Sequence, residues 1–146
     1  MIEIREVFSA SWDHEEELIL RNAVLRKPLG LNLYEQDLTL EKDYFRIAAF
    51  LKKDNSIAGS LLLVPIDDRI IQMKQMAVKE SLQTMGIGRE IISFAETFIE
   101  DRGYNEIILN ARKNALDFYL KMGYQVRGEE FVEVGIPHFK MVKKIN

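Results

Sequence analysis

The stretch QTMGIGRE, from Gln83 to Glu90, contains residue types that can bind phosphate groups. Gly86 and Gly88 lie one residue apart, between an apolar run and a helical pattern. Glycine lets a ligand approach the backbone closely, and the first amide groups of a helix have no partner inside the helix. Arg89 adds a formal positive charge. The loop could therefore hold a pyrophosphate, or it could simply form a tight turn.

Several other site classes are excluded by the residues around this loop. A P-loop requires a lysine directly after its last glycine, and none follows Gly88. A dinucleotide fingerprint requires a third glycine where this chain has Ile91. The chain has no cysteine, and His14 and His138 are its only histidines, so we expect no metal site.

Hydrophobic periodicity predicts the elements that position the loop. The expected order is β-α-(α)-β-β-β-α-β-α-β-β, which is a mixed α/β fold and not a doubly wound parallel one. Predicted strands cover 2–8, 44–51, 57–64, 70–78, 106–111, 124–135 and 138–144, and predicted helices cover 13–27, 88–102 and 114–123, with a short helix or loop at 37–43.

Local signals refine three of these elements. Alternation falters at 74–76, which hints at a bulge in the third strand of the central meander. Gly103 and Gly123 are expected to end the helices that precede them. Asn114 is the predicted N-cap of the last helix, with Asp117 three residues later.

Bulk composition limits the class of protein. The chain has 146 residues, enough for a single domain over 1–146, with 47% hydrophobic and 29% charged residues. Its formal net charge of -3 argues against a nucleic-acid binder, which needs a basic face. The N-terminal segment is too charged for a signal peptide and no apolar run is long enough to span a membrane, so we expect a cytoplasmic protein.

Two motifs in their order resemble the GNAT superfamily of N-acetyltransferases. The family's acetyl-CoA signature is [Q/R]-x-x-G-x-[G/A], and QTMGIG matches every fixed position. The later FYLKMGY, Phe118 to Tyr124, resembles the family's second signature, about 30 residues further on. The resemblance covers about 57–145, and the first third fits only in its β-α outline. The segments LRNAVLRKPLGL and FVEVGIPHFKM are similar to an ElaA-like bacterial branch.

This resemblance implies a mostly antiparallel central sheet flanked by helices, and acetyl-CoA as cosubstrate. It implies transfer of the acetyl group to a primary amine of a small molecule or peptide by direct attack, which agrees with the absence of a cysteine nucleophile. It also makes a homodimer a candidate assembly. The coenzyme-binding residues it implies are Met76, Ala77, Val78, Gln83, Thr84, Met85, Gly86, Ile87, Gly88, Arg89, Asn110, Asn114 and Phe118.

Tyr119 is the catalytic residue that the resemblance implies. A tyrosine hydroxyl can protonate the coenzyme thiolate as it leaves, although a tyrosine here could equally be a core residue. The group that deprotonates the acceptor amine stays open among Glu133, His138 and a water held by Gln75.

The acceptor site is the least defined part of the sequence. Arg21 and Arg26 could line it, or they could be exposed helix charges, which is the interpretation we favour for Arg21. An arginine that points inward would suggest an acceptor carrying a carboxylate. Two alternatives to an enzyme remain: a coenzyme-A-binding regulatory module without turnover, and a purely structural domain.

Overall fold

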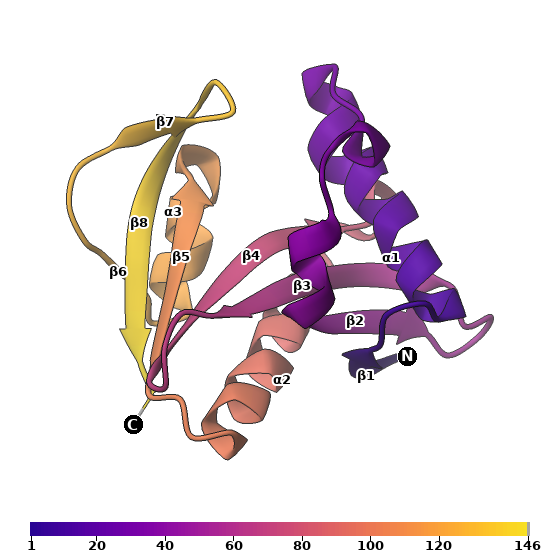
Figure 1. The fold of residues 1–146 in the computed structure, drawn as a ribbon, viewed down its shortest axis with the longest axis horizontal. Helices are drawn as coiled ribbons and strands as arrows, with labels where there is room; N and C mark the ends of the chain where they lie inside the picture. Colours follow the sequence, from indigo (N-terminus) through magenta and orange to yellow (C-terminus); the bar gives the residue numbers. More distant parts are fainter. Residues whose placement is uncertain (146) are drawn as a thin grey trace. The chain divides into compact units, whose positions relative to one another are not determined.

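The computed structural model of the chain describes residues 1–145 and contains a sheet flanked by helices (Figure 1). Within these residues the sheet has eight strands in the order β1-β2-β3-β4-β5-β8-β6, and β7 pairs with β8. The main elements are β1 (Ile2–Val7), α1 (Trp12–Arg21), β2 (Phe45–Leu51), β3 (Ile57–Pro65), β4 (Ile70–Val78), α2 (Ile87–Asp101), β5 (Glu106–Arg112), α3 (Leu116–Lys121), β6 (Gln125–Val126), β7 (Phe131–Glu133) and β8 (Ile136–Lys144).

The predicted mixed, mostly antiparallel sheet is confirmed. Strands β1 and β2, β2 and β3, and β5 and β8 pair antiparallel, while β4 and β5 pair parallel. The prediction of one strand over 124–135 is wrong, because the chain leaves β8 between β6 and β7. Gly128, with φ +88°, lies in this interruption and provides a backbone conformation that ordinary strand residues avoid.

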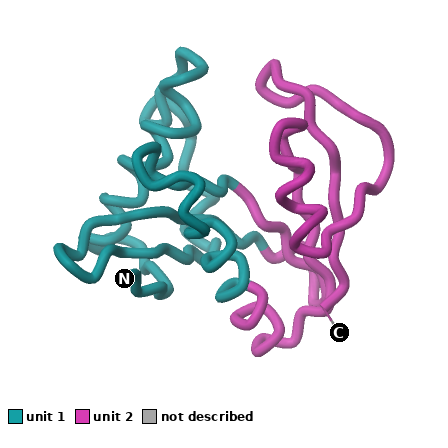
Figure 2. The backbone as a smooth tube through the Cα atoms, turned by 180° about the vertical axis from the view of Figure 1, so that it is seen from behind, with its two compact units in different colours: residues 1–64, 75–95 teal, residues 65–74, 96–146 magenta. Residues whose placement is uncertain are grey.

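The described chain forms two compact units, which Figure 2 colours separately. Unit 1 comprises residues 1–64 and 75–95, and unit 2 comprises residues 65–74 and the chain from Glu96 onward. Strand β4 and helix α2 each contribute residues to both units.

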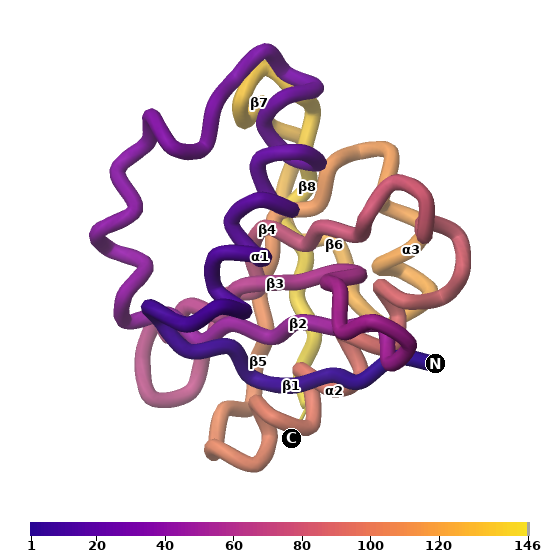
Figure 3. The backbone as a smooth tube through the Cα atoms, turned by 90° about the vertical axis from the view of Figure 1, so that its right-hand side faces the viewer, coloured from indigo at the N-terminus to yellow at the C-terminus, as the bar shows by residue number. Residues whose placement is uncertain are grey.

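In unit 1, helices cover both faces of the strands (Figures 1 and 3). On one face, Leu20 of α1 belongs to a buried cluster with Val7, Phe50 and Ala77. On the other face, the first half of α2 brings Ile91 next to β3. Helix α1 is capped by the Ser11 side chain, which accepts a hydrogen bond from the backbone amide of His14.

Beyond Arg21 the helical path widens and then tightens before the chain turns. It continues as a π-helix at Asn22–Arg26 and a 3₁₀ turn at Lys27–Leu29, and Gly30 ends it with φ +73°. The predicted helix over 13–27 thus has the right extent. A 3₁₀ turn at Thr39–Asp43 then leads into β2.

In unit 2, the predicted N-cap of the last helix is wrong. A 3₁₀ turn covers Lys113–Ala115, so the helical path begins before Asn114 and α3 takes Ala115 as its N-cap, with no side-chain hydrogen bond. Asn114 is exposed inside that turn, and its side chain cannot cap a helix that has already begun. Gly103 and Gly123 have φ of +88° and +94°, as expected of residues that end helices.

Candidate active site

The glycine-containing loop connects β4 to α2 inside unit 1. After Val78, a 3₁₀ turn at Glu80–Leu82 leads to Thr84 and Gly86, which both have left-handed backbones with φ of +70° and +83°. Thr84, Met85 and Gly86 are exposed, and α2 begins at Ile87. The Glu90 amide donates to the Gly86 carbonyl (3.2 Å), as expected where a helix begins. The preceding helix-start amides have no partner within the helix and can serve an anion.

Gln83 closes this loop back onto the strand. Its side-chain Nε2 donates to the Val78 carbonyl oxygen at 3.0 Å, and the Lys79 amide donates to the Ala58 carbonyl at 2.8 Å. The Gln83 side chain therefore holds the end of β4. Sequence reasoning did not predict this role. Arg89 is exposed on the first turn of α2, where its charge is free to meet a ligand.

Strand β4 lacks its parallel neighbour over the part that leads to the loop. Its pairing with β5 covers Ile70–Met73, and among residues 1–145 no residue of Met76–Val78 pairs with β5. Ala77 is buried, whereas Met76 and Val78 are half-buried. One edge of this segment thus offers backbone donors and acceptors that an extended ligand can use.

Gly59 of β3 allows β4 and α2 to approach closely. A Cβ at Gly59 would lie 2.8 Å from Ile91 Cδ1 and 3.0 Å from the Ala77 carbonyl oxygen. The first distance is shorter than real Cβ contacts, and the second is tighter than most of them. The sequence signal was a glycine in a buried strand, which indicates close approach of another backbone, but the partner is evident only in the structure.

Arg21 is fully buried, so the interpretation of it as an exposed helix charge is wrong. Its guanidinium donates to both carboxylate oxygens of Glu41, at 2.8 and 2.7 Å, and to Glu17 at 3.1 Å. Its Nε donates to the Gln75 side-chain oxygen at 3.0 Å. The reason for the error is that Glu41 and Gln75 are distant in sequence.

The buried cluster around Arg21 balances its own charges. Arg46 is also buried, and its Nε lies 3.7 Å from Glu17 Oε1. Its guanidinium also donates to the backbone carbonyl of Glu41 at 2.6 Å. Burial raises the pKa of Glu17, and the charge and hydrogen bond of Arg21 oppose that rise. An inward-pointing Arg21 therefore does not imply an acceptor carboxylate, because two glutamates already neutralise the two arginines. Arg26 is half-buried and donates to Gln36 at 3.0 Å.

Tyr119 of α3 lies in the interior of unit 2. Its side chain is 8% exposed and packs edge-to-face against Phe118 and Tyr124, with ring centroids 5.1 and 5.8 Å apart. Burial raises the pKa of its hydroxyl to about 12. Among residues 1–145 this hydroxyl has no hydrogen-bond partner. It is therefore a protonated donor available to a ligand.

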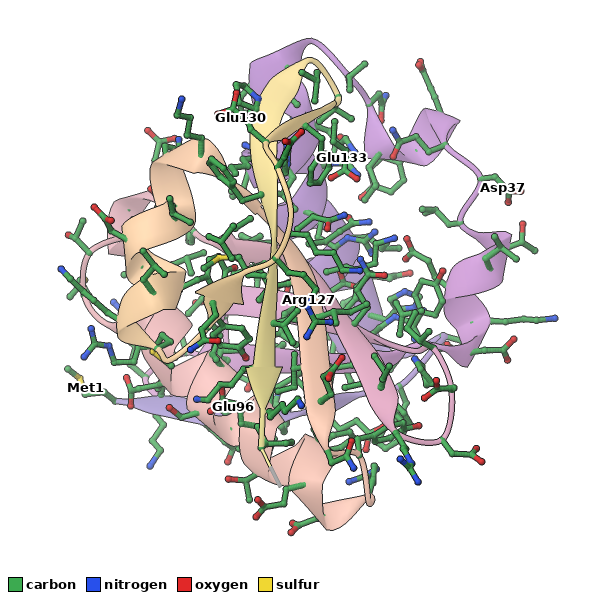
Figure 4. The ribbon with its side chains drawn as sticks, turned by 90° about the vertical axis from the view of Figure 1, so that its left-hand side faces the viewer. Met1, Asp37, Glu96, Arg127, Glu130 and Glu133 are labelled. Atoms are coloured by element: carbon green, nitrogen blue, oxygen red, sulfur yellow. The ribbon has the colours of Figure 1, made fainter. Side chains whose placement is uncertain are left out.

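Tyr124, by contrast, is committed to structure. Its hydroxyl donates to Glu96 at 2.9 Å, and Glu96 also accepts from Lys143 at 3.0 Å. Figure 4 shows Glu96 and Glu133 toward opposite ends of β8, in agreement with their contacts to Lys143 and His138. Tyr119 and Tyr124 thus differ in their hydrogen bonding although both are buried.

Two of the base candidates, Glu133 and His138, lie together in unit 2. His138 Nδ1 is 2.7 Å from the Ile136 carbonyl oxygen and therefore donates to it, while its Nε2 lies 3.5 Å from Glu133. The ring is 4% exposed and stacks on Phe131. The third candidate was a water held by Gln75, which belongs to unit 1 and whose side-chain oxygen already accepts a hydrogen bond from Arg21.

The two remaining predicted coenzyme contacts from the second motif lie near β5. Asn110 is half-buried within β5, opposite Lys140 of β8. Asn114 is exposed in the turn before α3. Over the described part of the chain, no group of three or more metal-ligating side chains comes together. None of the described helices combines the length and apolarity that a bilayer crossing requires.

Fold and motifs together define a member of the acetyltransferase class, and comparison with known sequences supports the assignment. The family model described as the acetyltransferase (GNAT) domain matches residues 20–145. The chain therefore belongs to the GNAT acetyltransferase family. YyaT of Bacillus subtilis, an uncharacterized protein, is 32% identical over 75 residues, which is 51% of each chain. YjcF of the same organism, an uncharacterized N-acetyltransferase, is 38% identical over 73 residues, 49% of this chain and 52% of YjcF. The matches thus span about half the length of these relatives.

Solved structures share the fold over nearly the whole chain. Escherichia coli ElaA is 21% identical, with a TM-score of 0.81 over 98% of this chain and 99% of ElaA. A GNAT family acetyltransferase from Elizabethkingia anophelis, solved with acetyl-CoA bound, is 19% identical, with a TM-score of 0.74 over 99% and 98%. An aminoglycoside 6'-N-acetyltransferase in complex with coenzyme A has a TM-score of 0.73 at 17% identity, over 97% and 96%.

Proposed function

We propose that this protein transfers the acetyl group of acetyl-CoA to a primary amine of a small molecule or peptide. The observation that carries the proposal is the loop between β4 and α2, where two left-handed residues expose backbone amides at a helix start beside Arg89. Acetyl-CoA and coenzyme A bound to two proteins of the same fold support the choice of cofactor.

In this proposal the coenzyme pyrophosphate binds the loop, through the amides of Thr84 to Gly88 and the charge of Arg89. The pantetheine arm adds to the free edge of β4 at Met76–Val78, where backbone groups have no β5 partner. Asn110, Asn114 and Phe118 are further proposed coenzyme contacts. Backbone amides near the thioester stabilise the oxyanion that develops on its carbonyl oxygen.

The proposed reaction is a direct attack. The neutral amine nitrogen forms a bond to the thioester carbonyl carbon, the carbon–sulfur bond breaks, and the coenzyme leaves as a thiolate. Tyr119, whose raised pKa keeps its unpartnered hydroxyl protonated at neutral pH, protonates that sulfur and then regains a proton from solvent. The amine loses its proton to solvent or to a base such as His138.

The first test is thermal unfolding of the full chain with acetyl-CoA, and with NAD and ATP as controls. A ligand at 100 times its dissociation constant stabilises by about 2.7 kcal/mol, which raises the midpoint by roughly 5–10 °C for a chain of this size. We expect a rise with acetyl-CoA alone. No rise at millimolar acetyl-CoA would overturn the proposal.

The second test separates an enzyme from a regulatory module that binds coenzyme A without turnover. Release of free coenzyme A thiol is followed while a panel of primary amines is supplied with acetyl-CoA. We expect amine-dependent thiol release by the wild-type protein and its loss in Tyr119→Phe. Binding of acetyl-CoA with no release for any amine would favour the regulatory module.

A further inference from the structure

The backbone of Gln75 is the most unusual feature of strand β4. Its φ of +53° is left-handed, although the residue is not glycine and lies inside a strand. The irregularity that the sequence hinted at over 74–76 is thus present. A side-chain-bearing residue adopts this conformation at a cost, and it persists only where the surrounding contacts impose it.

Arg21 contacts the side chain of this residue. The Gln75 side-chain oxygen accepts a hydrogen bond from Arg21 Nε at 3.0 Å. The guanidinium itself cannot follow a movement of Gln75, because Glu41 holds it by two short hydrogen bonds and Glu17 by a third. Arg21 and Glu17 have no exposed surface, so the anchor is rigid and shielded from solvent.

The chemistry of arginine also determines how the Gln75 amide is oriented. Arginine only donates hydrogen bonds, so the atom of Gln75 that faces Nε must be the carbonyl oxygen. One interaction therefore fixes the orientation of the Gln75 side chain, on a residue whose backbone is left-handed. The next residues are Met76–Val78, whose backbone edge has no β5 partner and which we assign to the pantetheine arm, the part of the coenzyme that carries the acetyl thioester at its end.

We propose that Arg21 is a positioning residue that acts through Gln75 to aim the backbone of Met76–Val78 at the acetyl group of bound acetyl-CoA. Glu17 and Glu41 serve this role by fixing the guanidinium. The inference rests on the proposed function and adds to it a positioning role for Arg21, which lies 54 residues before Gln75 in the sequence. Loss of the Arg21–Gln75 hydrogen bond changes recognition of the acetyl group and leaves recognition of the rest of the coenzyme intact.

Isothermal titration of the full chain with coenzyme A and with acetyl-CoA tests the proposal. In Arg21→Lys, the ammonium retains the positive charge beside Glu17 and Glu41 but has no donor at the position of Nε. We expect this variant to bind acetyl-CoA about five- to tenfold more weakly, the value of one hydrogen bond, with coenzyme A affinity within about twofold of wild type.

Arg46→Lys is the matched control. This variant also replaces a buried arginine of the cluster by lysine. Arg46 donates to Ser9 and to backbone carbonyls, however, and not to Gln75. We expect its two affinities to keep the wild-type ratio even if it lowers the unfolding temperature. An equal change of the ratio in both variants would mean that the cluster acts through general packing, and would overturn the proposal.

Substitution at Gln75 keeps the test decisive if Arg21→Lys fails to fold. Gln75→Met removes the hydrogen-bond acceptor and leaves the cluster's ion pairs, so it should lose the acetyl-CoA preference as Arg21→Lys does. Gln75→Glu retains an oxygen for Arg21 and should keep the wild-type ratio. In the double variant Arg21→Lys/Gln75→Met, the two losses of acetyl-CoA affinity should not add, because both substitutions remove the same hydrogen bond.

The outcomes distinguish this inference from the proposed function. If the wild-type protein binds neither coenzyme A nor acetyl-CoA, the proposed function fails. If it binds both and neither Arg21→Lys nor Gln75→Met alters the ratio, only the positioning role of Arg21 fails.

Discussion

Replacement of Gly59 by alanine tests whether the close approach of β3, β4 and α2 is as tight as the structure indicates. The new Cβ would lie 2.8 Å from Ile91 Cδ1, 3.0 Å from the Ala77 carbonyl oxygen and 3.4 Å from Val78 Cγ2. Favourable carbon–carbon contacts begin near 3.5 Å, so the Ile91 methyl group must retreat by about 1 Å. Ile91 is fully buried and the Ala77 oxygen belongs to the strand backbone, so neither can move freely.

The magnitude follows from these constraints. Overpacking a well-filled core typically costs about 1–3 kcal/mol, and alanine recovers about 0.4–1 kcal/mol by restricting the unfolded chain. We expect a net loss of about 1–2 kcal/mol, which lowers the unfolding midpoint by about 3–8 °C for a chain of this length. Calorimetric unfolding of Gly59→Ala and of the wild-type protein, side by side, measures this midpoint shift.

Gly128→Ala is the comparison that separates packing from backbone preference. A Cβ at Gly128 meets nothing within 4 Å, although its φ is +88°, whereas Gly59 has no left-handed backbone. Gly128→Ala should thus lose stability without any change in acetyl-CoA affinity, while Gly59→Ala should lose both because it displaces β4 at Ala77. An unchanged or higher midpoint for Gly59→Ala would refute the packing argument.

Three further substitutions address single groups. The Ser60 hydroxyl is buried and, among the described residues, has no hydrogen-bond partner, so Ser60→Ala should stabilise the protein by about 1 kcal/mol in chemical denaturation; a loss of stability would show that the hydroxyl is satisfied. Because burial raises the Tyr119 pKa to about 12, the wild-type turnover number should show no decline from this group up to pH 10, and Tyr119→Phe should lower it about 100-fold with little change in KM for acetyl-CoA. Burial lowers the His14 pKa from 6.5, so the unfolded state binds more protons than the folded state as the pH falls through 6.5, and stability should decrease below about pH 6.5; His14→Asn should flatten this slope in thermal scans, and an equal slope in both proteins would contradict it.

The sequence by itself determined the order of the elements and the place of the glycine loop. Gly103 and Gly123 have positive φ, and each was predicted from its place after a helical periodic segment, whereas Gly86 was predicted only to lie in the loop before the next helix. These features depend on near neighbours in the chain, because turn chemistry and hydrophobic periodicity act over a few residues. The loop from Gln83 to Arg89 was found for the same reason.

Tertiary structure alone decided the environment of the charged and capping residues. Arg21 follows Glu17 by four residues, a spacing typical of exposed helix pairs, and its burial depends on Glu41 and Gln75 from other elements. Asn114 has the residue type of an N-cap, but the preceding 3₁₀ turn starts the helical path before it. Burial, charge compensation and the left-handed backbone of Gln75 arise from contacts between segments far apart in the chain, and no local pattern encodes which segments will meet.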